Sequence, residues 1–309
     1  MKRPSALRSL LGLALVVATG CYQEPKPPAL PVPAPSTSTE AAEAPALPVS
    51  QTALWGGEKL IAEVSTSGVT VGRYELWVER PCVEAGRPML RVGSRAERTG
   101  VYAAFDDSGA VASSLIDAQE GVPVSSRAQV ESERDIKLFD VRYTPGSFQY
   151  RFDRRPKIPG RLPYYSEKDR RTPEHVPLHD IHSALGRVRA HADEIGWRGV
   201  LLVVFGRTLY QIDVEVAARE EVEAAGTSYK AIRIDGVARR LNYRNTPLKR
   251  QQGFSLWVSD EPIHLPVRAQ LDTNKRVLVA ELLDYVEPAR TPQPQLAPCQ
   301  APDEVARSE

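Results

Sequence analysis

Phe148-Gln149-Tyr150-Arg151-Phe152-Asp153 is the most regular alternation of apolar and polar residues in the chain. A period of two is typical of a β-strand that buries one face and leaves the other in water. Parallel strands are usually buried on both faces and read as continuous apolar runs between helices. This stretch therefore predicts an antiparallel sheet with one wet face.

The same alternation recurs on both sides of this stretch, from about Trp55 to Tyr285. Residues 199–205 are almost wholly apolar and predict a central strand. The order is many strands, one helix and many strands, without a βαβ rhythm. We therefore predict a mainly β domain: an antiparallel meander curled into an open barrel or half-barrel, with one helix packed across it. The other predicted strands are residues 60–64, 70–78, 89–98, 111–116, 125–131, 136–143, 210–216, 229–237, 253–259, 263–271 and 277–285.

Two segments interrupt the strands. Residues 156–177 contain five prolines among basic residues, and we expect a long exposed excursion there. Residues 178–195 predict a helix, capped by Asp180 or His179. The narrow apolar stripe of this helix is Ile181, Leu185 and Val188.

The N-terminus has the composition of an export signal. Lys2, Arg3 and Arg8 precede an apolar run at residues 10–17, about half of the ~20 residues that a spanning helix needs. Residues 1–20 are therefore predicted to be a cleaved leader. The protein would be exported to the cell envelope.

Ala18-Thr19-Gly20-Cys21 resembles the bacterial lipoprotein box, in which the cysteine thiol receives a diacylglycerol. We predict that Cys21 is lipidated and anchors the protein in the membrane. The alternative is an ordinary secretory signal with a chance cysteine. Tyr22 stands where an Asp would mark retention at the inner membrane, which favours the outer membrane, with the domain facing the periplasm.

The composition divides the rest of the chain. Residues 21–53 carry eight of the 26 prolines without periodicity, which predicts a disordered tether reaching up to ~100 Å at ~3.1 Å per residue. A globular domain at 54–287 and a proline-rich tail at 288–309 follow. A net charge of +1 argues against nucleic-acid binding driven by bulk charge.

The three cysteines indicate one disulfide. If Cys21 is lipidated, Cys82 and Cys299 remain as an even pair in an oxidising compartment. We predict a bridge between them that pins the tail to the front of the domain. Two free thiols are the alternative.

Three short motifs carry a resemblance to a known family. Gly57-Glu58-x-Leu60, then Val64, Gly68, Gly72 and Leu76, resembles the opening of an uncharacterised envelope domain, the domain of unknown function DUF 3108. Asp180-x-x-Ser183-Ala184-Leu185, with Arg189, is similar to the central helix of that family. Trp257-Val258-Ser259-Asp260 with Leu265-Pro266-Val267-Arg268 is similar to its late strand-turn-strand. The chain departs from the family at Ala62 and in the length of 156–177. The resemblance implies an exported β-rich domain without an established activity.

The histidines are a candidate metal set. His175, His179 and His182 cluster around Asp180, a combination that suits zinc. The chain has no His-Glu-x-x-His motif, and His191 lies three turns beyond His179. We therefore favour a solvated helix face, predict no cofactor, and keep a metal-dependent hydrolase as the weakest alternative.

Catalysis by a nucleophile finds little support. The chain has neither a Gly-x-Ser-x-Gly motif nor a Ser-x-x-Lys near a Ser-Asx-Asn. Ser183, Asp180 and His182 are close in sequence, but adjacent helix positions do not converge on one reacting atom. We predict that the protein is not an enzyme.

Two sets of residues are candidates for ligand contacts. Trp77 and Trp257 would line a concave apolar surface, covered either by the helix or by an amphiphile. The second set lies in a basic segment with three tyrosines, which would suit anionic lipid headgroups, lipopolysaccharide phosphates or an acidic partner; a solvated loop is the alternative. This second set is Arg154, Arg155, Arg170 and Arg171.

These features predict a lipid-anchored envelope protein whose non-catalytic domain binds an amphiphile or lipid-like ligand. The alternative is a scaffold or assembly lipoprotein that binds another envelope protein. An empty concave side of the sheet would favour the first function, and a filled one the second.

Overall fold

The computed structural model describes residues 52–99, 108–173, 176–273, 276–288 and 297–299. The leader, Cys21, nearly all of the tether and most of the C-terminal tail lie outside these residues. So does His175. The described residues contain no helix whose length and apolar character would allow it to cross a membrane.

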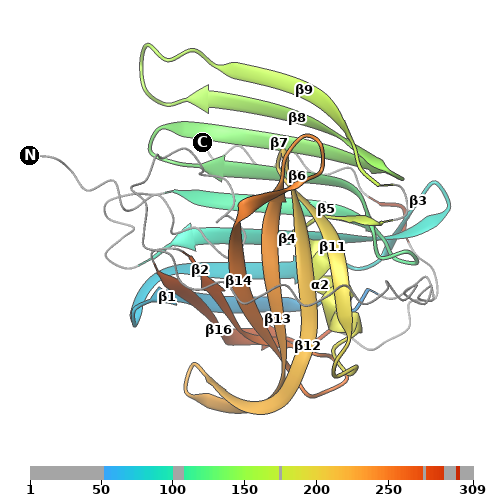
Figure 1. Ribbon diagram of the computed structural model, residues 1–309, viewed down its shortest axis with the longest axis vertical. Coiled ribbons are helices and arrows are strands. Elements are labelled where there is room, and N and C mark those ends of the chain that lie inside the picture. The colour runs from blue at the N-terminus through green and yellow to red at the C-terminus, as the bar shows by residue number, and fades with distance from the viewer. Residues whose placement is uncertain (1–51, 100–107, 174–175, 274–275, 289–296, 300–309) are drawn as a thin grey trace, which may run out of the picture.

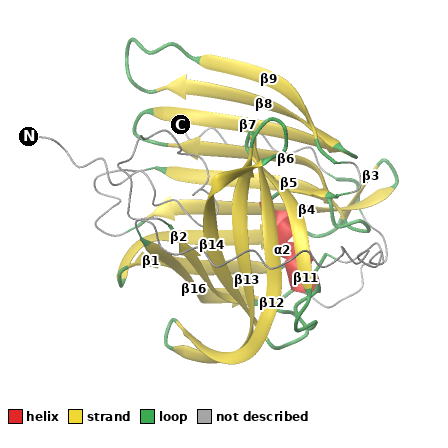
Figure 2. Ribbon diagram, in the orientation of Figure 1, coloured by secondary structure: helices red, strands yellow, loops and turns green. Residues whose placement is uncertain are grey.

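The described chain forms one large open sheet and one helix, α2 (Ile181–Ala190) (Figures 1 and 2). Neighbouring strands are antiparallel except for a two-residue parallel pair. The predicted fold class, a mainly β antiparallel sheet that curls without closing, is confirmed. The strands are β1 Lys59–Thr66, β2 Val69–Val78, β3 Cys82–Glu84, β4 Arg87–Arg98, β5 Gly109–Asp117, β6 Pro123–Glu131, β7 Asp135–Thr144, β8 Ser147–Pro156, β9 Tyr164–Arg171, β10 Leu178–His179, β11 Arg198–Phe205, β12 Thr208–Ala224, β13 Thr227–Leu241, β14 Pro247–Ser259, β15 Pro266–Asp272 and β16 Val277–Val286.

The order of the strands explains the curled shape. It runs β10-β11-β12-β13-β14-β15-β16-β1-β2-β4-β5-β6-β7-β8-β9, with β3 added to β4. In Figure 1, β11 to β14 cross steeply in front of β4 to β7, so the two limbs of one sheet face each other. Val141 and Phe148 of one limb pack against Leu202 and Leu209 of the other. The alternation at residues 148–153 thus places Phe148 and Phe152 inside, as predicted.

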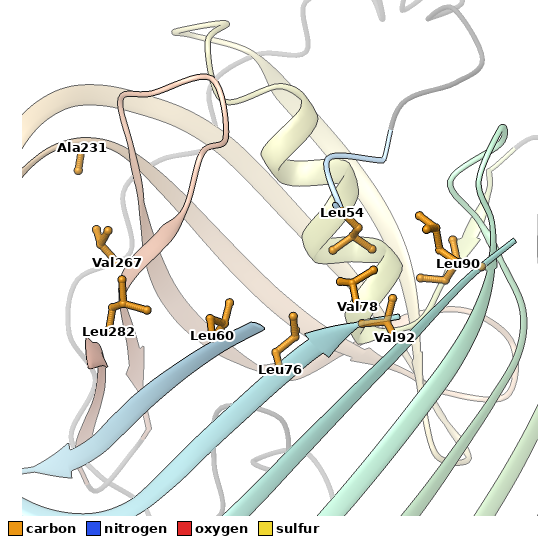
Figure 3. Packing of buried hydrophobic residues seen from close by; sticks show 10 residues of the cluster. Leu54, Leu60, Leu76, Val78, Leu90, Val92, Ala231, Val267 and Leu282 are labelled. Carbon is orange, nitrogen blue, oxygen red and sulfur yellow. The ribbon is translucent and has the colours of Figure 1, made fainter. Parts of the chain in front are cut away.

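Helix α2 lies between the two limbs. Ala184 and Val188 pack on the apolar faces of β11 to β14. Leu185 faces a second cluster built from β1, β2, β4 and β5, in which Leu54 lies beside the helix (Figure 3). The helix is therefore enclosed on most sides.

Two sequence-based predictions about this helix are wrong. It covers residues 181–190 and not 178–195, because Leu178 and His179 pair with Leu202 and Val203 as the short strand β10. Its polar face is not solvated, since His179, His182 and His191 are buried. Asp180 is the N-cap, as one of the two predicted alternatives had it, and forms a capping box with Ser183.

The predicted long excursion at residues 156–177 contains a strand. Residues 164–171 form β9, which pairs with β8 along its whole length. Only the turn between the two strands and a short connection to β10 remain outside the sheet. This edge strand is mostly exposed and carries Tyr-Tyr-Ser-Glu-Lys-Asp-Arg-Arg, so it lacks the apolar alternation that marks a half-buried strand.

The predicted disulfide is confirmed. Cys82 and Cys299 are bonded, with their Cα atoms 4.9 Å apart. The backbone of Val83 holds the same tail segment by accepting from the Cys299 N–H (3.0 Å) and donating to the Ala297 carbonyl (2.9 Å). The tail is thereby fixed beside β3.

Candidate ligand-binding groove

A groove of about 370 Å³ lies on the outer face of β4 to β9, the face turned away from the opposite limb. The register shows this placement. Leu90, Ile116 and Phe148 point into the core, so their strand neighbours on either side point outward. The side chains that line the groove and point outward are Arg91, Ser113, Leu115, Ser125, Arg127, Asp140, Arg142, Gln149, Arg151 and Glu167.

Two rows of paired residues run across the strands and form the groove. The first row crosses from Arg91 to Gln149 through Leu115, Ser125 and Arg142. Directly opposite residues in an antiparallel sheet have Cβ atoms only about 5 Å apart, so each row is a continuous strip of side chains.

The second row lies beside the first. It follows the register from Ser113 through Arg127, Asp140 and Arg151 to Glu167. Ser125 in the first row and Ser113 in the second are the smallest side chains that point outward, and their short side chains leave the hollow. These two serines of β5 and β6 are thus the local reason for a groove at this place.

The groove carries an excess of positive charge. Its lining includes four arginines and three carboxylates, and three of the arginines are paired, Arg91 with Glu79 at 3.8 Å. Arg127 contacts Asp140 at 2.9 Å, and Arg151 contacts Glu167 at 3.5 Å. Among the described residues, Arg142 has no carboxylate within ion-pair distance. Its guanidinium is the cation that a ligand could neutralise.

Hydrogen bonds organise the end of the groove at β9. The Tyr165 hydroxyl donates to Glu167 Oε2 at 2.6 Å, and this bond, with the charges of Arg151 and Arg142, lowers the pKa of Glu167. The charges of Tyr165 and Glu167 raise the pKa of Arg151. Glu167 therefore stays ionised and holds Arg151 at the rim.

The disulfide forms another part of the rim. Cys299 and Glu84 both line the groove, so the fixed tail segment borders it. Guanidinium groups with adjacent hydroxyls match the oxygens of a phosphate or carboxylate. The arrangement can bind an anion, and its lining contains no histidine or free thiol that would act as base or nucleophile.

The four arginines singled out from the sequence do not form one site. The register puts Arg155 and Arg171 on the outer face but Arg154 and Arg170 on the inner face. Arg155 pairs with Asp153, while the guanidinium of Arg154 lies over the ring of Tyr164.

Arg170 has a structural contact. It donates to the carbonyl of Asn242 and to Asn245 Oδ1, which ties β9 to the turn between β13 and β14. Desolvation lowers the pKa of Arg170. These four residues therefore do not share one face of the sheet, and a ligand contact of each one stays a prediction.

The two tryptophans do not line a common concave surface. Trp77 points outward and its ring covers Gly93. Trp257 donates from Nε1 to Glu220 at 2.6 Å, and the Arg268 guanidinium lies 5.7 Å from its ring centre. Their strands are four steps apart in the sheet, roughly 19 Å.

The concave side is packed. Five hydrophobic clusters occupy it, and the hollow between Tyr74, Ser94 and Phe205 measures about 10 Å³, the space of one water molecule at most. Side chains thus occupy the place where the sequence predicted an amphiphile.

The histidines of α2 have protein partners. His182 lies between Ser114 Oγ, 2.6 Å from its Nδ1, and Ser94 Oγ, 2.9 Å from its Nε2. Burial lowers the pKa of His182 and brings that of His179 to about 4, so both rings are neutral. Asp180 is engaged at the helix N-terminus and accepts from the Ser183 N–H.

Among the described residues, no three histidine, cysteine, aspartate or glutamate side chains are placed to hold a metal ion. His175, the third member of the predicted set, lies outside them. His182 and its two serines are almost fully buried, so a substrate could not reach them. The residues of the groove that sequence reasoning missed are Arg91, Arg127, Arg142, Ser113 and Ser125. The alternation of apolar and polar residues along their strands predicted only that these side chains point outward.

Comparison with known proteins gives one family. The sequence profile described as "Protein of unknown function (DUF3108)" matches residues 61–282. No curated protein matches the chain.

Three solved structures are similar at low identity. A β-barrel-like protein of the domain of unknown function DUF1849 from Brucella abortus has 10% identity and a TM-score of 0.42, covering 75% of this chain and 98% of its own. A protein of Bacteroides fragilis described as exported, with a YmcC-like fold, has 9% identity and a TM-score of 0.29. The match covers 76% of this chain and 97% of that protein. A protein of Parabacteroides distasonis described as a lipoprotein has 7% identity and a TM-score of 0.29. The match covers 75% of this chain and 95% of that protein.

Proposed function

The chain belongs to the DUF3108 family of proteins of unknown function, and we propose that it is a lipid-anchored, non-catalytic binding protein of the cell envelope. In this proposal Cys21 carries the anchor, the tether spaces the domain from the outer membrane, and the outer groove binds an anionic group of an envelope component. The phosphate or carboxylate head of an amphiphile is such a group.

One observation carries this function. Arg142 lies in the groove without an ion-pair partner among the described residues, beside the hydroxyl-bearing Ser125 and between two arginines that are already paired. A bound anion would add charge-assisted hydrogen bonds to Arg142 at little cost, since the site is open to water and the neighbouring side chains are already ordered. The packed concave side argues against a ligand held inside the sheet.

Titration calorimetry with inorganic phosphate, pyrophosphate and citrate tests the groove. We expect binding that weakens with salt and falls roughly ten-fold or more in Arg142→Gln, because a charged hydrogen bond contributes about 1.5–3 kcal/mol. Arg244→Gln is the matched control, since Arg244 is exposed and lies outside the groove lining. Equal affinity of the two variants for the anions, or no binding by the wild-type protein, would contradict the proposed anion binding.

The anchor has its own test. We expect the Cys21→Ser chain to lack the acyl mass that the wild-type protein carries, because the thiol is the acceptor of the lipid. Mass spectrometry of the intact purified protein measures this directly. Identical masses apart from the substitution would show that Cys21 is not modified.

The second candidate, a scaffold for another envelope protein, is favoured by the packed concave side and by the edge of the sheet. β9 pairs with β8 and with no other strand of the described chain, so one row of its backbone groups is open to a partner strand. A photo-crosslinking residue in place of Asp169 would capture such a partner. A crosslink that survives Arg142→Gln would separate this function from anion binding.

A further inference from the structure

The turn between β8 and β9 carries exposed apolar side chains. Leu162 is 82% exposed and Ile158 38% exposed, and the adjoining Tyr164 and Tyr165 are 44% and 56% exposed. In Figure 1 this turn lies at the upper left, at the end of β8 and β9 and away from β11 to β14. A single exposed leucine needs no explanation. Here Ile158 and Leu162 both belong to the turn, and Tyr164 and Tyr165 follow them on the two opposite faces of β9.

The turn is built by its own sequence. The Arg161 N–H donates to the Ile158 carbonyl, and Pro159 and Gly160 occupy the two central positions, with Gly160 at a φ of +80°. Proline followed by a residue of positive φ is the arrangement of a type II turn. At its base, the Lys157 N–H donates to the Arg134 carbonyl. The hairpin thus presents Ile158 and Leu162 from a defined backbone.

A basic collar surrounds these apolar groups. Residues 154–165 include four basic side chains and no acidic one. Two of them, Arg155 and Lys157, have carboxylate partners in Asp153 and Glu131. Arg161, at the tip, is exposed and has no ion pair among the described residues.

Apolar side chains at a tip, tyrosines behind them and a collar of Arg and Lys are the features of an element that sits in a membrane interface. An acidic protein surface would complement the charges, but it would bury Leu162 and Ile158 only if it carried a matching apolar pocket. An anionic bilayer accommodates both the basic and the apolar side chains. Its headgroups pair with the collar, and the boundary of its acyl chains accepts the apolar tip.

We propose that the β8–β9 hairpin docks into the headgroup region of an anionic lipid leaflet, a second membrane contact besides the lipid anchor. The inference draws on the proposed anchor only for proximity, since a tether of about 30 residues can span up to ~100 Å. It does not depend on the anion groove. Docking would fix the orientation of the domain on the membrane.

Leu162→Trp reports the depth of the tip. The full chain carrying this substitution is reconstituted in vesicles of phosphatidylcholine alone or mixed with phosphatidylglycerol, with brominated acyl chains as quencher. We expect the introduced indole to be quenched in the anionic vesicles and much less in the neutral ones. Leu283→Trp is the matched control, because Leu283 is 52% exposed on β16, seven strands from β8, and its fluorescence should not change.

The charges are tested in the same background. Combining Arg154→Gln, Arg155→Gln, Lys157→Gln and Arg161→Gln should abolish the quenching, since each basic residue near an anionic surface changes binding by about five-fold. Circular dichroism of each variant checks that the sheet is intact. Unquenched fluorescence of the Leu162→Trp protein in anionic vesicles, or quenching equal to that of the Leu283→Trp protein, would overturn the proposal.

Two further arms separate this proposal from the proposed function. Arg142→Gln should leave the quenching of the Leu162→Trp protein unchanged within about two-fold, because Arg142 is not part of the β8–β9 turn. If Cys21 carries no lipid, the unanchored protein is added to preformed vesicles, and Leu162→Asp should then reduce its co-sedimentation relative to wild type. Equal sedimentation of the two proteins would count against docking, whatever anchors the chain.

Discussion

Arg189 and Glu58 lie 131 residues apart in the sequence and form a fully buried, bidentate salt bridge. The two bonds measure 2.9 Å (Nη1 to Oε1) and 3.1 Å (Nη2 to Oε2). Arg189 also donates from Nε to the His264 carbonyl and from Nη2 to the Ile263 carbonyl. The bridge thus joins the end of α2, the start of β1 and the loop before β15.

Arg189→Met should destabilise the domain strongly. The substitution leaves the Glu58 carboxylate buried without a partner, which costs about 3–5 kcal/mol. Urea unfolding followed by circular dichroism measures the change, and adding Glu58→Gln should recover part of the loss. Arg198→Gln is the control: its pair with Glu215 is exposed and should contribute less than about 1 kcal/mol. A similar small effect of Arg189→Met would contradict the role of the bridge.

The stability of the domain should fall below neutral pH. Burial brings the pKa of His179 to about 4 and lowers that of His182, while both groups titrate near 6.5 in the unfolded chain. Between these values the unfolded state binds more protons, so stability present above pH 6.5 is lost as the pH falls toward 4. For His179 alone this amounts to about 3 kcal/mol.

Denaturant unfolding at pH 7.5, 5.5 and 4.5 checks this dependence, with pH steps spanning roughly the range between the two pKa values. His179→Asn should flatten the profile, because it removes the group whose ionisation is suppressed. Carboxylates remain in both proteins, so the difference between the two profiles isolates the imidazole. Parallel profiles would show that His179 is not the source.

Gly93→Ala should destabilise the sheet by about 1–3 kcal/mol. A Cβ at this position would lie 2.3 Å from ring carbons of Trp77, and the ring would have to move. Gly253→Ala, on β14, is the matched control, since the nearest neighbour there is Asp272 Oδ2 at 3.9 Å. Thermal unfolding compares the two variants. Trp77→Leu should relieve the defect of Gly93→Ala, and equal midpoints for the two alanine variants would refute the contact.

Loss of the disulfide should lower stability by up to about 5 kcal/mol, since the closed loop spans 217 residues. Replacing both Cys82 and Cys299 with serine, or adding a reductant to the wild type, should shift the unfolding midpoint in the same direction. Reductant should have no effect on the double variant. Non-reducing peptide mapping confirms the bond, and a wild-type midpoint insensitive to reductant would contradict its contribution.

The regular part of the fold could be predicted from the sequence. The alternation of residues 148–153 defined both the strand and its buried face, because adjacent side chains of a strand point to opposite sides whatever lies around them. Asp180 as one of two candidate helix caps, and the pairing of Cys82 with Cys299, also followed from local chemistry and parity. These features depend on few neighbours.

Other features had no local signal. β9 is an edge strand exposed on both faces, so the hairpin with β8 and not an apolar pattern keeps it in the sheet. Arg154 and Arg155 are adjacent in sequence, and their opposite faces become significant only when the opposing limb gives the sheet an inside and an outside. The polar face of α2 resembled a solvated one because the serines that bind His182 come from β4 and β5.

The sequence by itself determined most of the strands, which of their side chains share a face, and the pairing of Cys82 with Cys299. The tertiary structure decided which strands are neighbours, and hence that Ser125, Arg142 and Gln149 form one row and that Glu58 meets Arg189. The reason is physical. A period of two is a property of the backbone, whereas the order and register of strands depend on packing between residues more than a hundred positions apart.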